Sequence, residues 1–309
     1  MKNKKIFSPK NRGAAPRPPA GARPKKFNRS TPVLSTTQQK AAVQSKQAQL
    51  DSSSTLFKNS SRVVCGTHAL SELFLVHAPG VVELWLRQGW ESSEDLRQLN
   101  ELALRFKIKS EVKTVAALDR INAGHQGAVA FVAKDPLWTP QWKTQIEKGL
   151  LEKSDPSVLL FLDGLEDPHN LGAILRTSWL MGVQGIFIPQ DRAVGLTPTV
   201  HKVACGGVEH VPVVQTTSFA RDIEELKQKG YWVFGLSHKS EKTLFDMKLP
   251  EKVIWMIGAE DKGLRVSSEK LCDELVQIPQ QSASASYNAS VAAAIALCET
   301  SRQHLRKSL

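Results

Sequence analysis

Three pairs of polar residues in the C-terminal half have the types and spacing that group-transfer chemistry requires. They are Asn170 with Arg176, Gly258 with Glu260, and Ser286 with Asn288. Amide, carboxylate and guanidinium groups can orient a hydroxyl and stabilise charge that develops on a reacting oxygen. Glycine allows the backbone to approach a ligand closely. These residues are therefore the first candidates for a site.

The first pair lies between a predicted strand and a predicted helix. Residues 158–162 form an uninterrupted apolar run, typical of a strand buried on both faces. A polar turn follows, and from Leu171 the apolar residues fall at helical spacing until Gly182. This pattern predicts Asn170 as the helix N-cap and places Arg176 about two turns further on.

The other two pairs also follow predicted strands, at residues 253–257 and 276–279. In a parallel sheet the carboxyl ends of the strands meet at one edge, so all three pairs can line one crevice. Taken singly, each pair is better explained as loop glycines, a helix cap at Asn288 or Ser290, and surface charges. Three pairs at three strand ends favour a ligand site instead.

Two common nucleotide sites are excluded by the glycine patterns. The segment from Gly258 to Gly263 lacks the Lys-Ser/Thr pair of a phosphate-binding P-loop, because Leu264 and Arg265 follow it. No G-x-G-x-x-G motif follows a predicted strand, which argues against a nicotinamide-dependent oxidoreductase.

Charge and composition divide the chain into four predicted parts. Residues 1–61 hold 13 Lys/Arg and one acidic residue, whereas the remainder holds 28 Lys/Arg and 29 acidic residues. We expect 1–61 to be a disordered basic tail, because it has too few core-forming residues to offset its ordering entropy. It could bind RNA phosphates, act as a solubilising tail, or act as a transit peptide. The other predicted parts are a small α/β/α domain at 62–134, a linker at 135–156 and a mostly parallel α/β domain at 157–309.

The secondary-structure pattern is specific enough to test. In the first domain, strands are expected at 62–65, 81–86, 107–112 and 128–132, and helices at 67–77, 93–106 and 115–121. In the second domain, further strands are expected at 185–189, 211–214 and 231–236, and helices at 197–205, 219–229, 267–272 and 290–306. In this pattern His125 lies in a turn and is not expected to be catalytic.

The cysteines and apolar runs limit the cellular setting. The four cysteines contain no C-x-x-C pair, so neither a zinc site nor a disulfide framework is indicated, and no metal is expected. No apolar run approaches the ~18 residues of a membrane span, and no signal-peptide core is present. We therefore expect a cytoplasmic protein without a membrane partner.

The polar motifs resemble those of the TrmH (SpoU) branch of the SPOUT RNA methyltransferases. They read Asn170-x-Gly-x-x-x-Arg176, Gly258-x-Glu260-x-x-Gly263, and Ile278-Pro followed by Ser286-x-Asn288-x-Ser290. Residues 64–132 are similar to the ribosomal-protein-like substrate-binding domain often fused to this branch. The resemblance covers about three quarters of the chain. It implies a trefoil-knotted methyltransferase domain, an S-adenosylmethionine (SAM) pocket, an RNA partner (ribosomal or transfer RNA) and a homodimer.

The resemblance assigns a role to each motif residue. Matching positions cradle SAM with the backbone of Gly258, Ile278 and Tyr287. The expected catalytic residues are Asn170, Arg176, Glu260, Ser286 and Asn288. The chain departs from the family pattern at four positions, where it has Asp261, Gln280, Ser282 and Tyr287. These departures put the affinity for SAM in question more than the capacity for catalysis.

The implied reaction is SAM-dependent methylation of a ribose 2′-oxygen, with base methylation disfavoured. The family proposal makes the arginine at position 176 the proton acceptor. Because arginine stays protonated in proteins, we interpret Arg176 as a clamp on the RNA phosphate and the developing alkoxide. The alternative is an RNA-binding or ribosome-assembly protein that keeps the fold while methyl transfer has weakened. The altered segment from Gln280 to Ser286 motivates that alternative.

Overall fold

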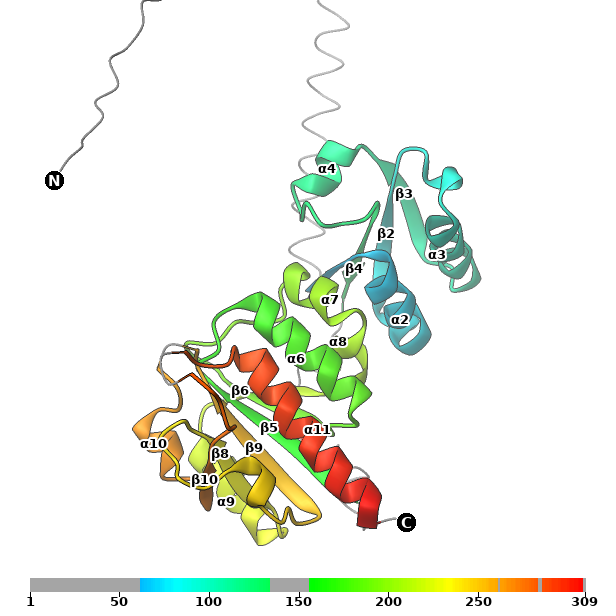
Figure 1. Ribbon diagram of the computed structural model, residues 1–309. Coiled ribbons are helices and arrows are strands. Elements are labelled where there is room, and N and C mark those ends of the chain that lie inside the picture. The colour runs from blue at the N-terminus through cyan, green and yellow to red at the C-terminus, as the bar shows by residue number, and fades with distance from the viewer. Residues whose placement is uncertain (1–61, 134–155, 261, 283–284, 308–309) are drawn as a thin grey trace, which may run out of the picture. The chain divides into compact units, whose positions relative to one another are not determined.

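Two β-sheets organise the described part of the chain. The computed structural model describes residues 62–133, 156–260, 262–282 and 285–307 (Figure 1). The predicted basic tail and almost all of the predicted linker lie outside these residues, so their assignments stay predictions. The boundaries of the domains stay predictions as well.

The first sheet is mixed and carries helices on both faces. Its strands are β1 (Arg62–Cys65), β2 (Val81–Arg87), β3 (Lys109–Lys113) and β4 (Ala128–Val132), in the order β1-β4-β2-β3. β4 is antiparallel to both neighbours, whereas β2 and β3 are parallel. Buried residues of α2 (Thr67–His77) and α3 (Glu94–Arg105) form a core with one face of the sheet. Leu118 of α4 (Val115–Asp119) joins a second core on the other face. The predicted α/β/α arrangement is therefore observed.

The second sheet is entirely parallel. Its strands are β5 (Ser157–Asp163), β6 (Gly185–Pro189), β7 (Val213–Thr216), β8 (Trp232–Leu236), β9 (Lys252–Gly258) and β10 (Glu274–Val276). They lie in the order β10-β8-β9-β5-β6-β7, and every adjacent pair is parallel. β5 and β9 are neighbours at the centre, with Asp163 paired to Gly258 at the carboxyl ends. Two of the three predicted polar pairs therefore start from adjacent strands.

Alternating residues of β5 face two different cores. Leu160 and Leu162 pack with helices α6 (Pro168–Leu180), α7 (Pro198–Ala204), α8 (Gly207–His210) and α11 (Ala289–Lys307). Leu159 and Phe161 pack with α9 (Phe219–Gln228) and with residues near α10 (Val266–Glu269). The remaining elements are the short 3-10 helices η1 (Ala78–Gly80), η2 (Trp90–Ser92) and η5 (Leu244–Asp246). A strand buried on both faces explains the uninterrupted apolar run in the sequence.

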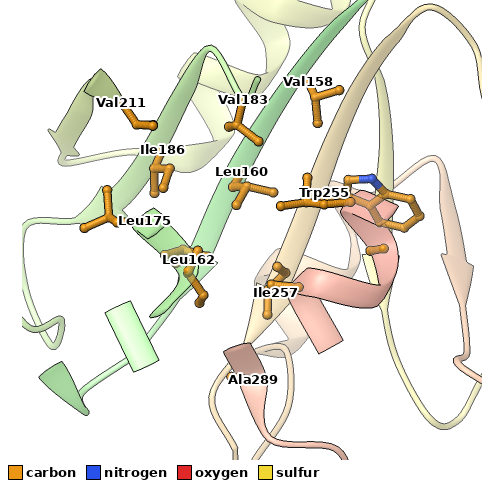
Figure 2. Packing of buried hydrophobic residues seen from close by; sticks show 14 of the residues in the cluster. Val158, Leu160, Leu162, Leu175, Val183, Ile186, Val211, Trp255, Ile257 and Ala289 are labelled. Atoms are coloured by element: carbon orange, nitrogen blue, oxygen red, sulfur yellow. The ribbon is translucent and has the colours of Figure 1, made fainter. Parts of the chain in front are cut away.

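Trp255 of β9 anchors the larger of these cores (Figure 2). Its side chain is fully buried, and its indole Nε1 donates a hydrogen bond to the hydroxyl of Thr300 on α11 at 2.9 Å. A buried indole usually finds such a partner, because an unpaired N–H would be costly. The contact fixes α11 against the centre of the sheet.

Helix α6 begins earlier than the sequence pattern predicted. Its N-cap is Asp167, whose carboxylate accepts a hydrogen bond from the backbone N–H of His169 at 2.9 Å. Pro168 is the first helical residue, a position where its missing N–H costs nothing. The prediction that Asn170 caps this helix is therefore wrong, and Asn170 lies within the first turn. The predicted stop is correct, since Gly182 has a φ of +68° just beyond the helix.

Two further predictions near the C-terminus are wrong in their bounds. The strand expected at 276–279 is β10, which ends at Val276, before Pro279. The helix expected at 267–272 is a single turn that ends at Glu269. Among the helices that the structure describes, none combines the length and apolarity needed to cross a bilayer.

Candidate active site

Asn170, Glu260 and Asn288 meet in one hydrogen-bonded cluster, which we call the amide–carboxylate cluster. The side-chain amide of Asn288 donates to Glu260 Oε1 at 2.6 Å and to Asn170 Oδ1 at 3.0 Å. The amide of Asn170 also donates to Glu260 Oε1. Asn170 is buried, while Glu260 and Asn288 are exposed. Two amides, from residues 118 positions apart in the chain, thus share one acceptor, Oε1 of Glu260.

The topology brings these residues together. Asn170 lies in α6, which follows β5, and Glu260 lies in the loop that follows β9, the neighbour of β5. Asn288 directly precedes α11 and also accepts from the backbone N–H of Ser290 at 2.9 Å. Asn288 therefore serves both as the helix cap that the sequence allowed and as a member of the cluster.

The loop after β9 is a tight hairpin with no room for a side chain at Gly258. A Cβ atom there would lie 2.1 Å from the carbonyl carbon of Gly263, and the backbone N–H of Gly263 donates to Ala259 O at 2.8 Å. Gly263 itself has a φ of +64°, which favours glycine. The two glycines hold Glu260 at the tip of a fixed turn.

An ion pair between the buried Asp163 and the partly exposed Arg265 ties this hairpin to the end of β5. The carboxylate of Asp163 accepts from the backbone N–H of Arg265 at 2.9 Å and from its Nε at 2.6 Å. Asp163 is almost fully buried, so both of its oxygens depend on this residue. The pair fixes the relative position of the segments that carry Asn170 and Glu260.

A first cavity of about 180 Å³, which we call the cofactor cavity, lies on one side of the hairpin. Five of the residues predicted from the motifs line it: Gly258, Glu260, Ile278, Ser286 and Tyr287. Apolar side chains of Leu236, Ile257 and Leu264 and polar groups of Ser237 and Lys239 complete much of the wall. A ligand with an apolar ring and a charged end would match this mixture of groups.

Two residues that line this cavity, Gln280 and Tyr287, form hydrogen bonds with nearby backbone carbonyls. The phenol of Tyr287 donates to Pro279 O at 3.2 Å, and the amide of Gln280 donates to Ala285 O at 3.0 Å. Two of the four residues that depart from the family pattern, Gln280 and Tyr287, therefore have local backbone partners.

Arg176 lies apart from the amide–carboxylate cluster. Its side chain is exposed on α6, and its Nη1 lies 3.5 Å from Cys205 Sγ at the end of α7. It does not line the cofactor cavity. The structure thus unites four of the five predicted catalytic residues around the hairpin and leaves Arg176 elsewhere on the surface.

The sequence interpretation missed a fourth strand end that contributes to the cofactor cavity. Ser237, His238 and Lys239 follow β8 directly and line the cavity together with Glu269. The ammonium of Lys239 lies 3.7 Å from a carboxylate oxygen of Glu269. These residues directly follow a predicted strand, which could have marked them as candidates. They contain no recognisable motif, so they were not chosen.

Burial keeps two of the four cysteine thiols protonated. Burial raises the pKa of the Cys65 thiol and of the Cys272 thiol to about 12, so both stay protonated near neutral pH. Within the ranges that the structure describes, no group of three or more His, Cys, Asp or Glu side chains is arranged to hold a metal ion. The groups around the hairpin instead suit ligand binding and hydrogen-bond chemistry.

Comparison with known families gives matches over both sheets. Residues 157–298 match the SpoU rRNA methylase family, and residues 63–138 match the RNA 2′-O ribose methyltransferase substrate-binding domain. Both matches agree with the resemblance seen in the motifs.

Individual relatives extend over most of the chain. The 23S rRNA (guanosine-2′-O-)-methyltransferase RlmB of Pseudomonas aeruginosa is 40% identical over 78% of this chain and 96% of the relative. The enzyme of the same name from Neisseria meningitidis is 37% identical over 80% of this chain and 97% of the relative. Among solved structures, the SpoU methyltransferase AviRb of Streptomyces viridochromogenes in complex with AdoMet has a TM-score of 0.66. It is 20% identical, over 79% of this chain and 90% of that chain, and so shows a shared fold.

Proposed function

The chain belongs to the SpoU rRNA methylase family, and from this we propose that it methylates the ribose 2′-oxygen of a guanosine in 23S ribosomal RNA. The enzyme class predicted from the motifs, a SAM-dependent RNA 2′-O-methyltransferase, is confirmed by these matches. The choice of ribosomal over transfer RNA follows from the relatives named for that activity. The observation that carries the proposal is the amide–carboxylate cluster, whose central acceptor, Glu260, lines the cofactor cavity.

SAM is the expected cofactor, and the chemistry of the cofactor cavity fits it. When bound, SAM supplies an electrophilic methyl group. Backbone groups of Gly258, Ile278 and Tyr287 would hold it, while Lys239 offers a positive charge for its carboxylate. The cavity of about 180 Å³ is smaller than the ~300–1,000 Å³ of common ligand sites. We therefore expect this cavity to widen when SAM binds.

The amide–carboxylate cluster positions the reacting groups. Glu260 accepts hydrogen bonds from two amides, which keeps its carboxylate in place at the hairpin tip. Its other oxygen, or the Asn288 side chain, can bind the ribose 2′-hydroxyl and orient it for attack. Ser286 lies at the rim of the same cavity and would contribute a further hydroxyl contact. The cluster thus supplies orientation, which accounts for much of the rate gain in such reactions.

Arg176 would act on the RNA rather than on SAM. Its guanidinium is exposed and lies outside the cofactor cavity. A phosphate of the RNA can therefore reach it from solvent. A planar guanidinium binds a phosphate through two parallel hydrogen bonds. We propose that it neutralises the phosphate next to the target nucleotide and so stabilises the developing alkoxide.

A homodimer would extend the surface around Arg176. Helices α6 and α11 contact each other, and both expose apolar side chains, including Leu180 and Val291. Such residues favour burial in an interface. We expect a dimer in sedimentation analysis, and Val291→Glu should shift it toward monomer. A dimer that is unaffected by this substitution would place the interface elsewhere.

We also propose that the chain is knotted at the end of this domain and that it works in the cytoplasm. The return of the chain from the edge strand β10 to α11, which packs on α6 and β9, supports the knot. A crystallographic trace of residues 258–307 would test it. The cytoplasmic location follows from a ribosomal substrate in bacterial relatives, and cell fractionation would test that location.

Methyl transfer to unmodified 23S rRNA tests the function directly. The protein is incubated with a 23S rRNA transcript and methyl-labelled SAM, and the modified position is mapped by reverse transcription. We expect one 2′-O-methylguanosine with the wild-type protein and none with Glu260→Ala. RNA binding without transfer by the wild type would instead support the ribosome-assembly alternative, which the altered segment from Gln280 to Ser286 motivates.

A further inference from the structure

A second cavity of about 480 Å³ lies against the same hairpin as the cofactor cavity. Ala259, Glu260, Lys262 and Gly263 line both cavities, and Asn170 lines the second. Of the amide–carboxylate cluster, Glu260 therefore lies in the wall shared by the two cavities, and Asn170 adds to the wall of the second. A group transferred between ligands in the two cavities would have to pass this wall.

The second cavity has the size and place of a ligand site. Its volume falls within the ~300–1,000 Å³ of common small-molecule sites, and it exceeds that of the cofactor cavity. It borders the carboxyl ends of β5 and β9, where parallel sheets bind their ligands. One nucleotide, splayed out of an RNA loop, is of this size class.

Three charged side chains line this cavity without an internal partner. Asp163 is already paired with Arg265, and Asp167 caps α6. Glu166, Arg192 and Lys262 are exposed, and among the residues that the structure describes no hydrogen bond or ion pair involves their side chains. One carboxylate and two cations thus remain available to a ligand.

The backbone conformation of Arg192 is a second, independent indication of a functional site. This residue has a φ of +58°, in the left-handed region that costs a non-glycine residue about 1 kcal/mol or more. Such strain clusters at sites where a side chain must be presented in one direction. Arg192 belongs to the loop after β6, so a third strand end contributes to the second cavity.

We propose that the second cavity binds the target guanosine, with Glu166 reading the base and Arg192 and Lys262 holding the adjacent phosphates. This inference rests on the proposed function. Guanine carries two adjacent N–H donors, N1–H and the 2-amino group, on its Watson–Crick edge. A carboxylate presents two acceptor oxygens and no donor, so it matches this edge and leaves an adenine edge poorly satisfied. The two cations supply the charge that flanking phosphates require.

The test compares guanosine with inosine, which lacks the 2-amino group, at the mapped position of the 23S rRNA transcript. For the wild type we expect kcat/KM to fall at least tenfold on inosine. For Glu166→Gln we expect kcat/KM on guanosine to fall by about 10- to 100-fold, and the guanosine-to-inosine ratio to approach one. Glu241→Gln, at an exposed carboxylate away from both cavities, is the matched control and should behave as the wild type.

The cations are tested by their effect on binding rather than on base choice. Arg192→Ala and Lys262→Ala should each raise KM for both RNAs alike and reduce the salt dependence of RNA binding by about one unit of slope. Affinity for SAM, measured by calorimetry, should be unchanged in Glu166→Gln and Arg192→Ala, which also shows that these variants are folded.

The outcomes separate this inference from the function on which it rests. A wild-type protein that does not methylate the transcript overturns both. A wild-type protein that methylates it, together with a Glu166→Gln variant that keeps the wild-type preference for guanosine over inosine, overturns the base-reading pocket alone. An unchanged salt slope in both cation variants overturns the phosphate contacts.

Discussion

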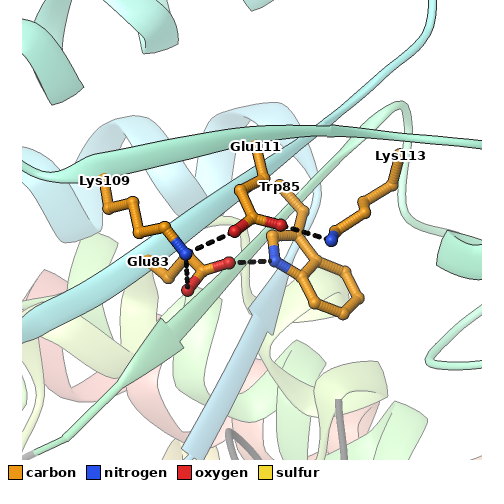
Figure 3. Close-up of polar contacts among 5 residues, drawn as sticks. All are labelled: Glu83, Trp85, Lys109, Glu111 and Lys113. Atoms are coloured by element: carbon orange, nitrogen blue, oxygen red, sulfur yellow. Dashed lines mark hydrogen bonds and ion pairs between the residues drawn. The ribbon is translucent and has the colours of Figure 1, made fainter. Parts of the chain in front are cut away.

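The two sheets carry clusters of charged residues that differ in how their charges are compensated. On the first sheet, the β3 charge cluster consists of Glu83, Trp85, Lys109, Glu111 and Lys113 (Figure 3). Lys109 pairs with both glutamates, and Glu111 also pairs with Lys113. On the second sheet, three charged residues that line the second cavity, Glu166, Arg192 and Lys262, have no such partners among the described residues.

This difference in pairing distinguishes charged residues that stabilise the fold from charged residues that we propose bind a ligand. The β3 charge cluster includes the edge strand of its sheet, where lysines also discourage pairing with other chains. Its charges are satisfied without any partner molecule. At the carboxyl edge of the second sheet, exposed charges stay hydrated until an RNA displaces the water. We therefore expect substitutions in the first cluster to change stability and substitutions at the second edge to change activity.

The largest effect is expected at Arg176. Arg176→Ala should reduce the rate of methyl transfer by about 10²–10³, because a stabiliser of charge in the transition state is lost. Affinity for SAM should survive, since Arg176 lies outside the cofactor cavity. Single-turnover kinetics and calorimetry measure the two quantities. Activity within a factor of two of the wild type would show that Arg176 has no role in catalysis. It would also contradict the expectation that exposed charges on the second sheet affect activity.

The next effect concerns Tyr287, which we expect to contact SAM mainly through its backbone. Tyr287→Leu should bind SAM within about tenfold of the wild type, since a backbone contact tolerates a new side chain. Among the described residues, only the hydrogen bond from the phenol to Pro279 O is lost in this variant. Tyr287→Pro should abolish binding, because it removes the amide and alters the turn. Loss of binding in the leucine variant would make the phenol itself essential.

The sequence predicted the second sheet and the meeting of its strand ends well. Buried parallel strands produce apolar runs in the sequence, and the carboxyl ends of parallel strands meet at one edge of the sheet. From these two rules the proximity of Asn170, Glu260 and Asn288 could be predicted, and the structure shows it. The helix cap was misassigned because Pro168 is a good first residue, which moves the cap to Asp167. Strand β10 was misplaced because the polar residues Glu274 and Gln277 flank its short apolar core.

The second cavity could not be predicted, because no pattern in the sequence encodes how loops meet. Glu166, Arg192 and Lys262 come from three different loops and show no motif. The contact of Arg176 with Cys205 likewise depends on how α6 packs against α7. Local patterns predict elements and strand ends, whereas cavities depend on long-range packing.

A smaller effect, on stability, is expected in the β3 charge cluster. The carboxylate of Glu83 is buried and accepts from the indole Nε1 of Trp85 at 2.6 Å. Glu83→Ala leaves this buried N–H without its partner and should lower the free energy of unfolding by about 1–3 kcal/mol. Lys109→Ala, at a side chain that is 62% exposed, should lower it by less than about 1 kcal/mol. Urea denaturation measures both, and methyl transfer by the folded variants should be unchanged.

The smallest effect is the pH dependence that Glu111 contributes. Hydrogen bonds from Lys109 and, to a lesser extent, Lys113 hold the pKa of Glu111 below the usual range of a glutamate. A carboxyl whose pKa is lowered by folding stabilises the protein above its unfolded pKa, and this stabilisation is lost as the pH falls through the folded pKa. Because the pairs are partly exposed, the contribution should be a few tenths of a kcal/mol. Unfolding measured between pH 7 and pH 3 should therefore show a slightly shallower loss of stability in Glu111→Gln than in the wild type.

Glu101→Gln, at an exposed glutamate of α3, serves as the control and should follow the wild-type curve. If the two variants are indistinguishable, the ion pairs of Glu111 add nothing measurable, and the contrast between the sheets would rest on Glu83 alone.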